Sequence, residues 1–230
     1  MSWAYLISKP ISSRLKVYPN LYLLLLCGIL PDIDLLLGAA GLQHRTLTHS
    51  VLFWLFLFAP IFAKYRRVAL PYFVAVTQHI LYGDLVVGST PILWPLWDLK
   101  FGLGLSILSP TNLILEGIGL AIFVIVIIFE SQRQYFFAPG RSGFLSLLII
   151  APLFGFLALT MGNGYHISLL LDQSDAKHLE KNITSLLANN YFQVVLGLHI
   201  GMFLFMLIPL LRASFAMINK RFMESKRIED

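Results

Sequence analysis

Long apolar runs separated by short polar connections dominate the chain from residue 19 onward. Each run is close to the roughly 17–25 residues that a membrane-spanning helix needs. The predicted spans cover residues 19–39, 46–63, 68–88, 111–129, 143–162 and 190–211. The pattern therefore predicts an all-α fold, a polytopic membrane helical bundle with about six transmembrane segments.

The spans and their connections divide the chain into consecutive parts. In the N-terminal part we expect a short interfacial helix that Pro10 interrupts, with Trp3 and Tyr5 at the level of the lipid headgroups. The most polar connection, residues 163–189, is long enough for an outer loop with a short surface helix. The parts are a cytoplasmic or interfacial segment (1–18), a first half of the membrane domain that carries the polar motifs (19–129), a second half (130–215) and a basic cytoplasmic tail (216–230).

Composition supports a membrane protein and argues against a soluble one. The chain of 230 residues is 57% hydrophobic and only 13% charged, whereas soluble domains carry about 25% charged residues. Its mean hydropathy is +0.76. The single cysteine, Cys27, lies in an apolar run and allows no disulfide within the chain, so we expect it to pack as a small apolar residue.

Basic residues in the connections give the bundle an orientation. With six spans, every basic cluster falls on the same face, which the positive-inside rule makes cytoplasmic. The net charge of +5 then reflects topology, and no aromatic–basic motif indicates a nucleic-acid partner. We therefore expect a multi-pass protein of the cell (cytoplasmic) membrane with both termini cytoplasmic and the lipid bilayer as its partner; no pattern sets an oligomeric state. The clusters are Lys9, Arg14 and Lys16; Lys64, Arg66 and Arg67; Arg133 and Arg141; and Lys220, Arg221, Lys226 and Arg227.

Carboxylates and imidazoles interrupt the apolar runs of the first half. An intramembrane carboxylate costs roughly 2.5–3.5 kcal/mol on insertion scales, so four of them cost on the order of 10 kcal/mol. A structural zinc site contributes roughly 10–16 kcal/mol and can offset that cost. In the six-span topology these groups meet in the outer leaflet, which predicts one shared metal site. The candidate ligands are Asp32, Asp34, His44, His49, His79 and Asp84, and Glu116 is expected in the same leaflet beside them. Their mixture of donors suits zinc, manganese or iron better than calcium.

The spacing of these residues does not fit regular helices. Asp32 and Asp34 would point about 200° apart on a helix, so only one of them is expected at the metal unless Pro31 opens the turn. His79 and Asp84 would point about 140° apart. A helix end or a π-bulge near Gly83 would bring them together.

His44 and His49 are also five residues apart and would not share one helix face. They converge if His44 lies in a loop and Thr46 or Thr48 caps the helix that carries His49.

The ordered motifs resemble a known family. They are Pro31-Asp32-Ile33-Asp34, His44-Arg45-x-x-Thr48-His49-Ser50, Gln78-His79-Ile80-Leu81, Asp84 and Leu93-Trp94-Pro95. Together, over roughly the first 120 residues, they resemble the LexA-regulated, membrane-bound metal-dependent hydrolases. The resemblance implies a multi-pass hydrolase with Asp32, Asp34, His44, His49, His79 and Asp84 as metal or active-site positions. The chain departs from that family in lacking a histidine within residues 1–18 and in placing Asp84 five, rather than four, residues after His79.

These observations predict metal-dependent hydrolysis of a lipid-like or membrane-associated substrate by a metal-activated water. Asp32, Asp34, Arg45 and Glu116 are the catalytic candidates. Glu116 or the spare aspartate would take the proton of the water, and Arg45 would clamp a phosphate or carboxylate group. The alternatives are an ion or proton transporter that uses the same acids and histidines, and a membrane protein with a purely structural metal.

Overall fold

The computed structural model describes residues 1–34, 44–105, 109–129, 141–162 and 190–229. Its elements are helical, apart from an isolated antiparallel bridge between Thr90 and Phe101. The predicted all-α class is therefore confirmed for this part of the chain. The principal helices are α1 (Ser2–Leu15), α2 (Leu21–Cys27), α4 (Val51–Tyr65), α5 (Leu70–Gln78), α6 (Pro110–Phe129), α8 (Arg141–Gly162) and α12 (Asn190–Glu229).

Only two described helices are long and apolar enough to cross a membrane. They are α6 and the stretch Leu196–Ala216 of α12; a shorter apolar stretch, Gly143–Leu153, lies in α8. By contrast, α2, α4 and α5 have 7, 15 and 9 residues, which is less than the roughly 20 that a span needs. Within the described residues, the first two predicted spans are therefore shorter helices, the third is α5 continued by the π-helix His79–Asp84, and the six-span bundle stays a prediction.

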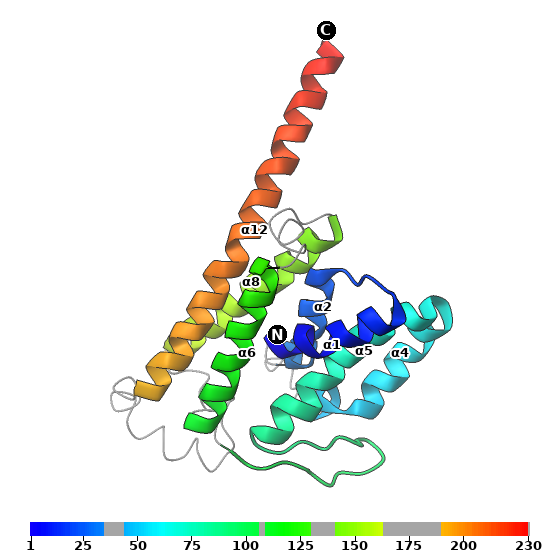
Figure 1. Ribbon diagram of the computed structural model, residues 1–230, viewed down its shortest axis with the longest axis vertical. Coiled ribbons are helices and arrows are strands. Elements are labelled where there is room, and N and C mark those ends of the chain that lie inside the picture. The colour runs from blue at the N-terminus through cyan, green and yellow to red at the C-terminus, as the bar shows by residue number, and fades with distance from the viewer. Residues whose placement is uncertain (35–43, 106–108, 130–140, 163–189, 230) are drawn as a thin grey trace.

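The N-terminal segment is part of the helical core. The helix α1 packs against α2, α5 and α6 (Figure 1). It runs unbroken through Pro10, so the expected interruption is wrong. Tyr5 is buried against Phe123 of α6, with ring centroids 5.4 Å apart, so its expected place among the lipid headgroups is also wrong. Tertiary contacts such as the hydrogen bond from Ser8 Oγ to the Pro71 carbonyl, 3.0 Å long, hold α1 despite the backbone donor that proline lacks.

The second half of the molecule is built from long helices. Figure 1 shows α8 crossing α12, and the two helices are in contact. The helix α12 continues to Glu229, so the predicted basic tail is an extension of a helix that projects beyond the other elements. The predicted outer loop, residues 163–189, lies outside the described residues.

Candidate metal centre

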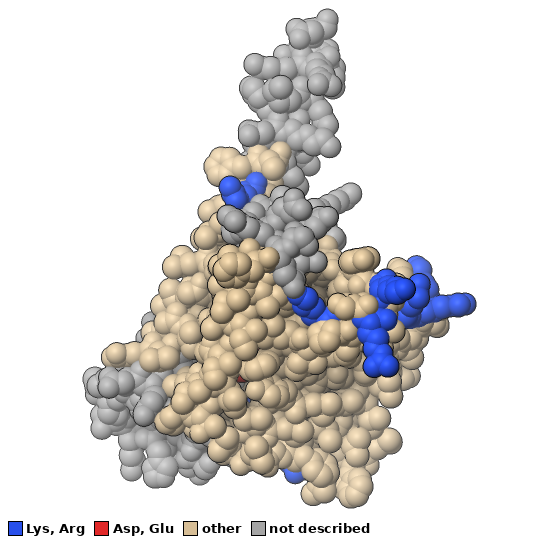
Figure 2. Space-filling view, viewed as in Figure 1, with Lys and Arg blue, Asp and Glu red and all other residues tan. Residues whose placement is uncertain are grey.

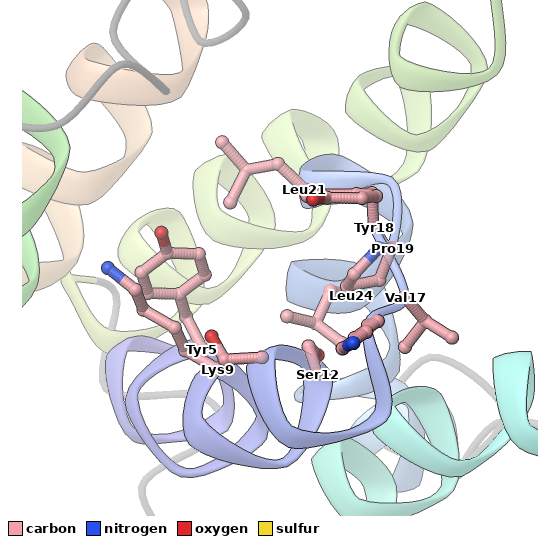
Figure 3. Close-up of a pocket in the computed structure, with 10 residues that line it drawn as sticks. Tyr5, Lys9, Ser12, Val17, Tyr18, Pro19, Leu21 and Leu24 are labelled. Atoms are coloured by element: carbon pink, nitrogen blue, oxygen red, sulfur yellow. The ribbon is translucent and has the colours of Figure 1, made fainter.

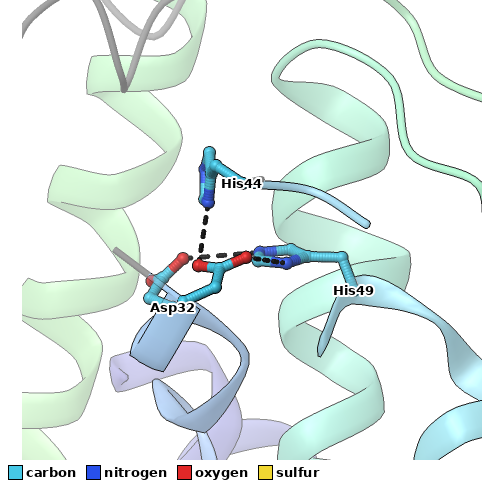
Figure 4. A group of neighbouring side chains, drawn as sticks. Asp32, His44 and His49 are labelled. Carbon is cyan, nitrogen blue, oxygen red and sulfur yellow. Dashed lines mark hydrogen bonds and ion pairs between the residues drawn. The ribbon is translucent and has the colours of Figure 1, made fainter. Parts of the chain in front are cut away.

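Three interruptions of regular helix meet at one place in the first half of the molecule. One follows α2, where Gly28 ends the helix and a 3₁₀ turn, Leu30–Asp32, comes next. Another is the 3₁₀ turn Leu47–His49, directly before α4. The third is a π-helix, His79–Asp84, that continues α5. With the adjacent Asp34 and His44 they carry the six predicted metal ligands, and Figure 4 shows Asp32, His44 and His49 pointing toward one another.

The turn after α2 directs its two aspartates to different partners. Asp32 Oδ1 lies 3.5 Å from His49 Nε2 and 3.2 Å from His79 Nε2. Asp34 Oδ1 lies 3.0 Å from His44 Nδ1, and Asp34 Oδ2 lies 3.2 Å from His49 Nδ1. The side chain of Asp34 is almost fully buried, whereas 23% of the Asp32 side chain is exposed. The divergence expected from the two-residue spacing is present, and both carboxylates contact His49 from opposite edges of its ring.

The turn before α4 places His49 at the centre of the cluster with no exposed surface. Thr48 donates its hydroxyl hydrogen to Asp34 Oδ2 at 2.8 Å. The helix is capped by Ser50, whose Oγ accepts a hydrogen bond from the Phe53 amide at 3.3 Å. The expectation that Thr46 or Thr48 caps this helix is therefore wrong. Asp34 takes up the Thr48 hydroxyl, and the helix begins too late for Thr46 to reach it.

The π-helix resolves the spacing of His79 and Asp84. A π-helix closes its hydrogen bonds between residues five apart, so side chains at that separation lie on the same side. His79 Nε2 is 3.6 Å from Asp84 Oδ2. The local break expected near Gly83 is therefore confirmed, and it has the form of a π-helix.

Four distances between histidine nitrogens and carboxylate oxygens in the cluster are those of neighbouring donors in a coordination shell. His49 Nε2 lies 3.5 Å from both Asp32 Oδ1 and Asp84 Oδ2. His79 Nε2 lies 3.2 Å from Asp32 Oδ1 and 3.6 Å from Asp84 Oδ2. Donors around tetrahedral zinc, with bonds of about 2.0–2.1 Å, are about 3.3–3.4 Å apart. The measured distances are close to that value.

The Nδ1 contacts of His49 and His79 define which nitrogen of each ring faces the carboxylates of Asp32 and Asp84. The Gly28 carbonyl can only accept, so His79 Nδ1, 3.1 Å away, carries the hydrogen. His49 Nδ1 likewise faces the Asp34 carboxylate. In the neutral rings the Nε2 lone pairs therefore point at the carboxylate oxygens, an arrangement that repels unless a metal ion lies between them or a proton on Nε2 makes each contact an ion pair.

Two buried atoms of the cluster also lack a hydrogen bond in the described structure: His49 Nε2 and Asp84 Oδ2. A buried polar atom without a partner is costly, and metal coordination would satisfy both atoms. The residues therefore fit a divalent metal.

The structure brings together every residue that the sequence predicts as a metal ligand. The set consists of two groups that share His49, and in each group the donor atoms lie within 4.8 Å of one another. One group is Asp32, Asp34, His44 and His49, and the other is His49, His79 and Asp84. Metal binding by these residues, and the identity of the metal, stay predictions.

Arg45 borders the cluster in a strained backbone conformation, with φ of 59°. Its amide donates to Asp34 Oδ2 at 3.3 Å, and its Nε lies 3.6 Å from Asp84 Oδ1. Gly88, itself at φ 88°, gives the guanidinium its space, because a Cβ at this position would collide with it. Gly88 is a site residue that sequence reasoning missed; its only signal is a glycine shortly after Asp84.

Glu116 is half-buried on α6, close enough to Tyr82 of the π-helix and to the N-terminal amine to interact with both electrostatically. Across the described ranges, no hydrogen bond or ion pair joins it to the cluster. The structure therefore brings Arg45, but not Glu116, into contact with the predicted ligands.

The comparisons with known proteins give one match. Residues 2–173 match the family model described as YdjM inner membrane protein, and this range includes all three interruptions that build the cluster. No curated protein and no solved structure matches the chain. The match supports a membrane protein, while LexA regulation and hydrolase activity remain what the sequence resemblance implies.

Proposed function

The chain belongs to the YdjM inner membrane protein family, and from the geometry of its cluster we propose that it is a membrane-embedded, metal-dependent hydrolase. The single observation that carries the proposal is the set of four short histidine–carboxylate distances that link Asp32, His49, His79 and Asp84. These distances of 3.2–3.6 Å suit a divalent ion. Zinc fits the donors best, with manganese and iron as alternatives.

A divalent metal, when bound, acts as a Lewis acid and lowers the pKa of a water toward 7. Asp32, His49, His79 and Asp84 hold the ion in this proposal. Asp34 positions His49 by accepting the hydrogen of its Nδ1, as carboxylates commonly do behind metal-binding histidines. The Gly28 carbonyl does the same for His79. Asp34 is thus a positioning residue rather than the general base expected of a spare aspartate.

We assign the proton transfer to Asp32. Its side chain is the most exposed of the clustered carboxylates, at 23% against 2% for Asp34 and 8% for Asp84. Its Oδ1 faces the histidines, which leaves Oδ2 to accept a proton from the attacking water. Glu116 stays the alternative base. Arg45 is the cation beside Asp84, and it would hold a phosphate or carboxylate group of the substrate.

A lipid-like substrate is favoured by the surface beside the cluster. The loop after the π-helix exposes large apolar side chains: Leu96, Trp97 and Leu103 are 83%, 59% and 74% exposed. Its far end is tied to the same element, because the Leu103 amide donates to the Leu85 carbonyl at 2.7 Å. An apolar loop at the edge of a polar site suits contact with lipid. In the proposed six-span topology this site faces away from the cytoplasm, and both termini are cytoplasmic.

Metal analysis of the purified protein tests the proposal. We expect a stoichiometric divalent metal by elemental mass spectrometry, and large losses of occupancy in His49→Ala and His79→Ala. The matched control is His199→Ala on α12, outside the cluster, which should retain the metal. Folded protein that takes up no metal under any supply would refute the metal centre.

The hydrolase half of the proposal needs a separate measurement. Phospholipids and lipid-linked phosphates should be turned over by the metal-loaded protein, and a chelator should abolish turnover. Asp32→Asn should lose turnover more than it loses metal. A metal-loaded protein without activity on such a panel would favour the structural-metal alternative.

A further inference from the structure

A pocket of about 270 Å³ opens between the C-terminal half of α1 and the start of α2 (Figure 3). None of its lining residues belongs to the metal cluster. Its polar side comes from lysines, tyrosines and serines, and its apolar side from the first turns of α2. The residues that matter below are Lys9, Lys16, Tyr5, Tyr18, Leu21 and Leu24.

The lining of this pocket is basic. It includes two lysines and no acidic residue. The lysines are not needed to cap α1, because the amides of Lys16 and Val17 already satisfy the carbonyls of Ser13 and Ser12, at 3.2 and 3.0 Å. The Lys9 ammonium lies 5.9 Å from the centroid of the Tyr5 ring. Partial burial lowers the pKa of Lys9, because it destabilises the charged form of the side chain. An anion bound in the pocket would stabilise that charged form.

The surroundings indicate which anion the pocket fits. Figure 2 shows lysines and arginines gathered on the side of the molecule where the α1–α2 and α4–α5 connections lie. Lys64, Arg66 and Arg67 belong to the second of these connections. Beside the pocket, Tyr18 is 93% exposed, as expected for an aromatic ring at a membrane interface. Basic clusters at such interfaces attract anionic lipid headgroups.

We propose that this pocket binds an anionic phospholipid, with Lys9 and Lys16 on the phosphate group and the exposed ring of Tyr18 beside the start of the acyl chains. The pocket combines the two chemistries that such a ligand presents: cationic donors at α1 and its C-terminal end, and an aromatic surface next to the buried Leu21 and Leu24. Free phosphate offers only the first of these. The site is independent of the metal centre and of the reaction proposed for it.

Native mass spectrometry of the full chain in detergent, with added phosphatidylglycerol or phosphatidylcholine, tests the site. We expect preferential binding of phosphatidylglycerol. Lys9→Gln with Lys16→Gln should weaken that binding roughly thirtyfold, from the contribution of each lysine near an anionic lipid. The matched control, Lys64→Gln with Arg67→Gln, removes the same charge from the neighbouring connection and should weaken binding less than about threefold. Lys9→Arg with Lys16→Arg should retain binding.

Two outcomes would overturn the proposal. Equal losses in the two glutamine variants would show general attraction by the basic side of the molecule and no specific pocket. Displacement of phosphatidylglycerol by an equal concentration of glycerol phosphate, which has the phosphate without acyl chains, would show a site for a soluble anion. Elution of each variant as folded, monodisperse protein keeps a loss of binding distinct from misfolding.

Discussion

The helices of the two halves of this molecule differ in length and in where their polar and apolar side chains lie. From α1 to the π-helix, helices are short, and polar side chains gather where they end. From α6 onward, helices have 20 or more residues, and their exposed faces carry isoleucines such as Ile118 and Ile125. Backbone groups at helix ends that are buried in the protein need hydrogen-bond partners within it. The first half provides them through the cluster, which explains why the candidate chemistry lies there.

Among the substitutions that test this difference between the halves, a change at Asp34 should have the largest effect. Asp34 follows the turn after α2, and its carboxylate contacts residues of the turn before α4. Asp34→Asn should weaken metal affinity about 10–100-fold, the usual effect of losing a carboxylate behind a metal-binding histidine. Competition titration with a chromogenic chelator measures it. Asn112→Asp, a reciprocal exchange at a buried position of α6, serves as the control from the second half and should leave metal affinity unchanged. Equal affinities for wild type and Asp34→Asn would remove Asp34 from its positioning role.

The next effect concerns Gly88, where the backbone and Arg45 both exclude a side chain. Its φ of 88° alone makes alanine unfavourable by about 1–2 kcal/mol. A Cβ would also collide with the Arg45 guanidinium and move it from Asp84. We expect Gly88→Ala to lower the thermal unfolding temperature and to weaken metal binding together. A variant as stable as wild type would show that the Arg45 guanidinium can move to another position without cost.

A smaller effect is expected at Ser50, which caps α4 and also donates to the Trp94 carbonyl. Ser50→Ala should lower the free energy of unfolding by about 1–2 kcal/mol through the lost cap and the lost loop contact. Ser13→Ala, at an exposed position of α1, is the control. Reversible denaturation in detergent compares the two variants, and equal stabilities would assign the cap elsewhere.

The sequence predicts the first half best where chemistry and spacing act together. The donors Asp32, Asp34, His49, His79 and Asp84 meet as expected, and the five-residue offset of His79 and Asp84 correctly indicates a break in the helix. On a regular helix, the angle between two side chains follows directly from their separation along the sequence.

What the sequence misses depends on partners distant along the chain. Thr48 does not cap α4, because Asp34, 14 residues earlier, accepts its hydrogen bond. Pro10 does not break α1, because neighbouring helices hold it. Apolar length did not indicate where α2 and α4 begin and end within the described residues, because apolar residues around a buried polar site are as hydrophobic as those facing lipid.

The smallest effect should come from Gly83, the residue that the sequence suggested as the cause of the π-helix. It has no positive φ, and a Cβ at this position would meet no atom within 4 Å. If the contacts of His79 and Asp84 in the cluster hold the π-helix, Gly83→Ala should change metal affinity by less than about twofold. Gly117 of α6 is a matched control, because its Cβ would also meet nothing within 4 Å. Alanine there should raise stability by up to about 1 kcal/mol, as in any regular helix. A large loss of metal affinity in Gly83→Ala alone would mean that glycine itself, and not the ligand contacts, sets the interruption that distinguishes the two halves.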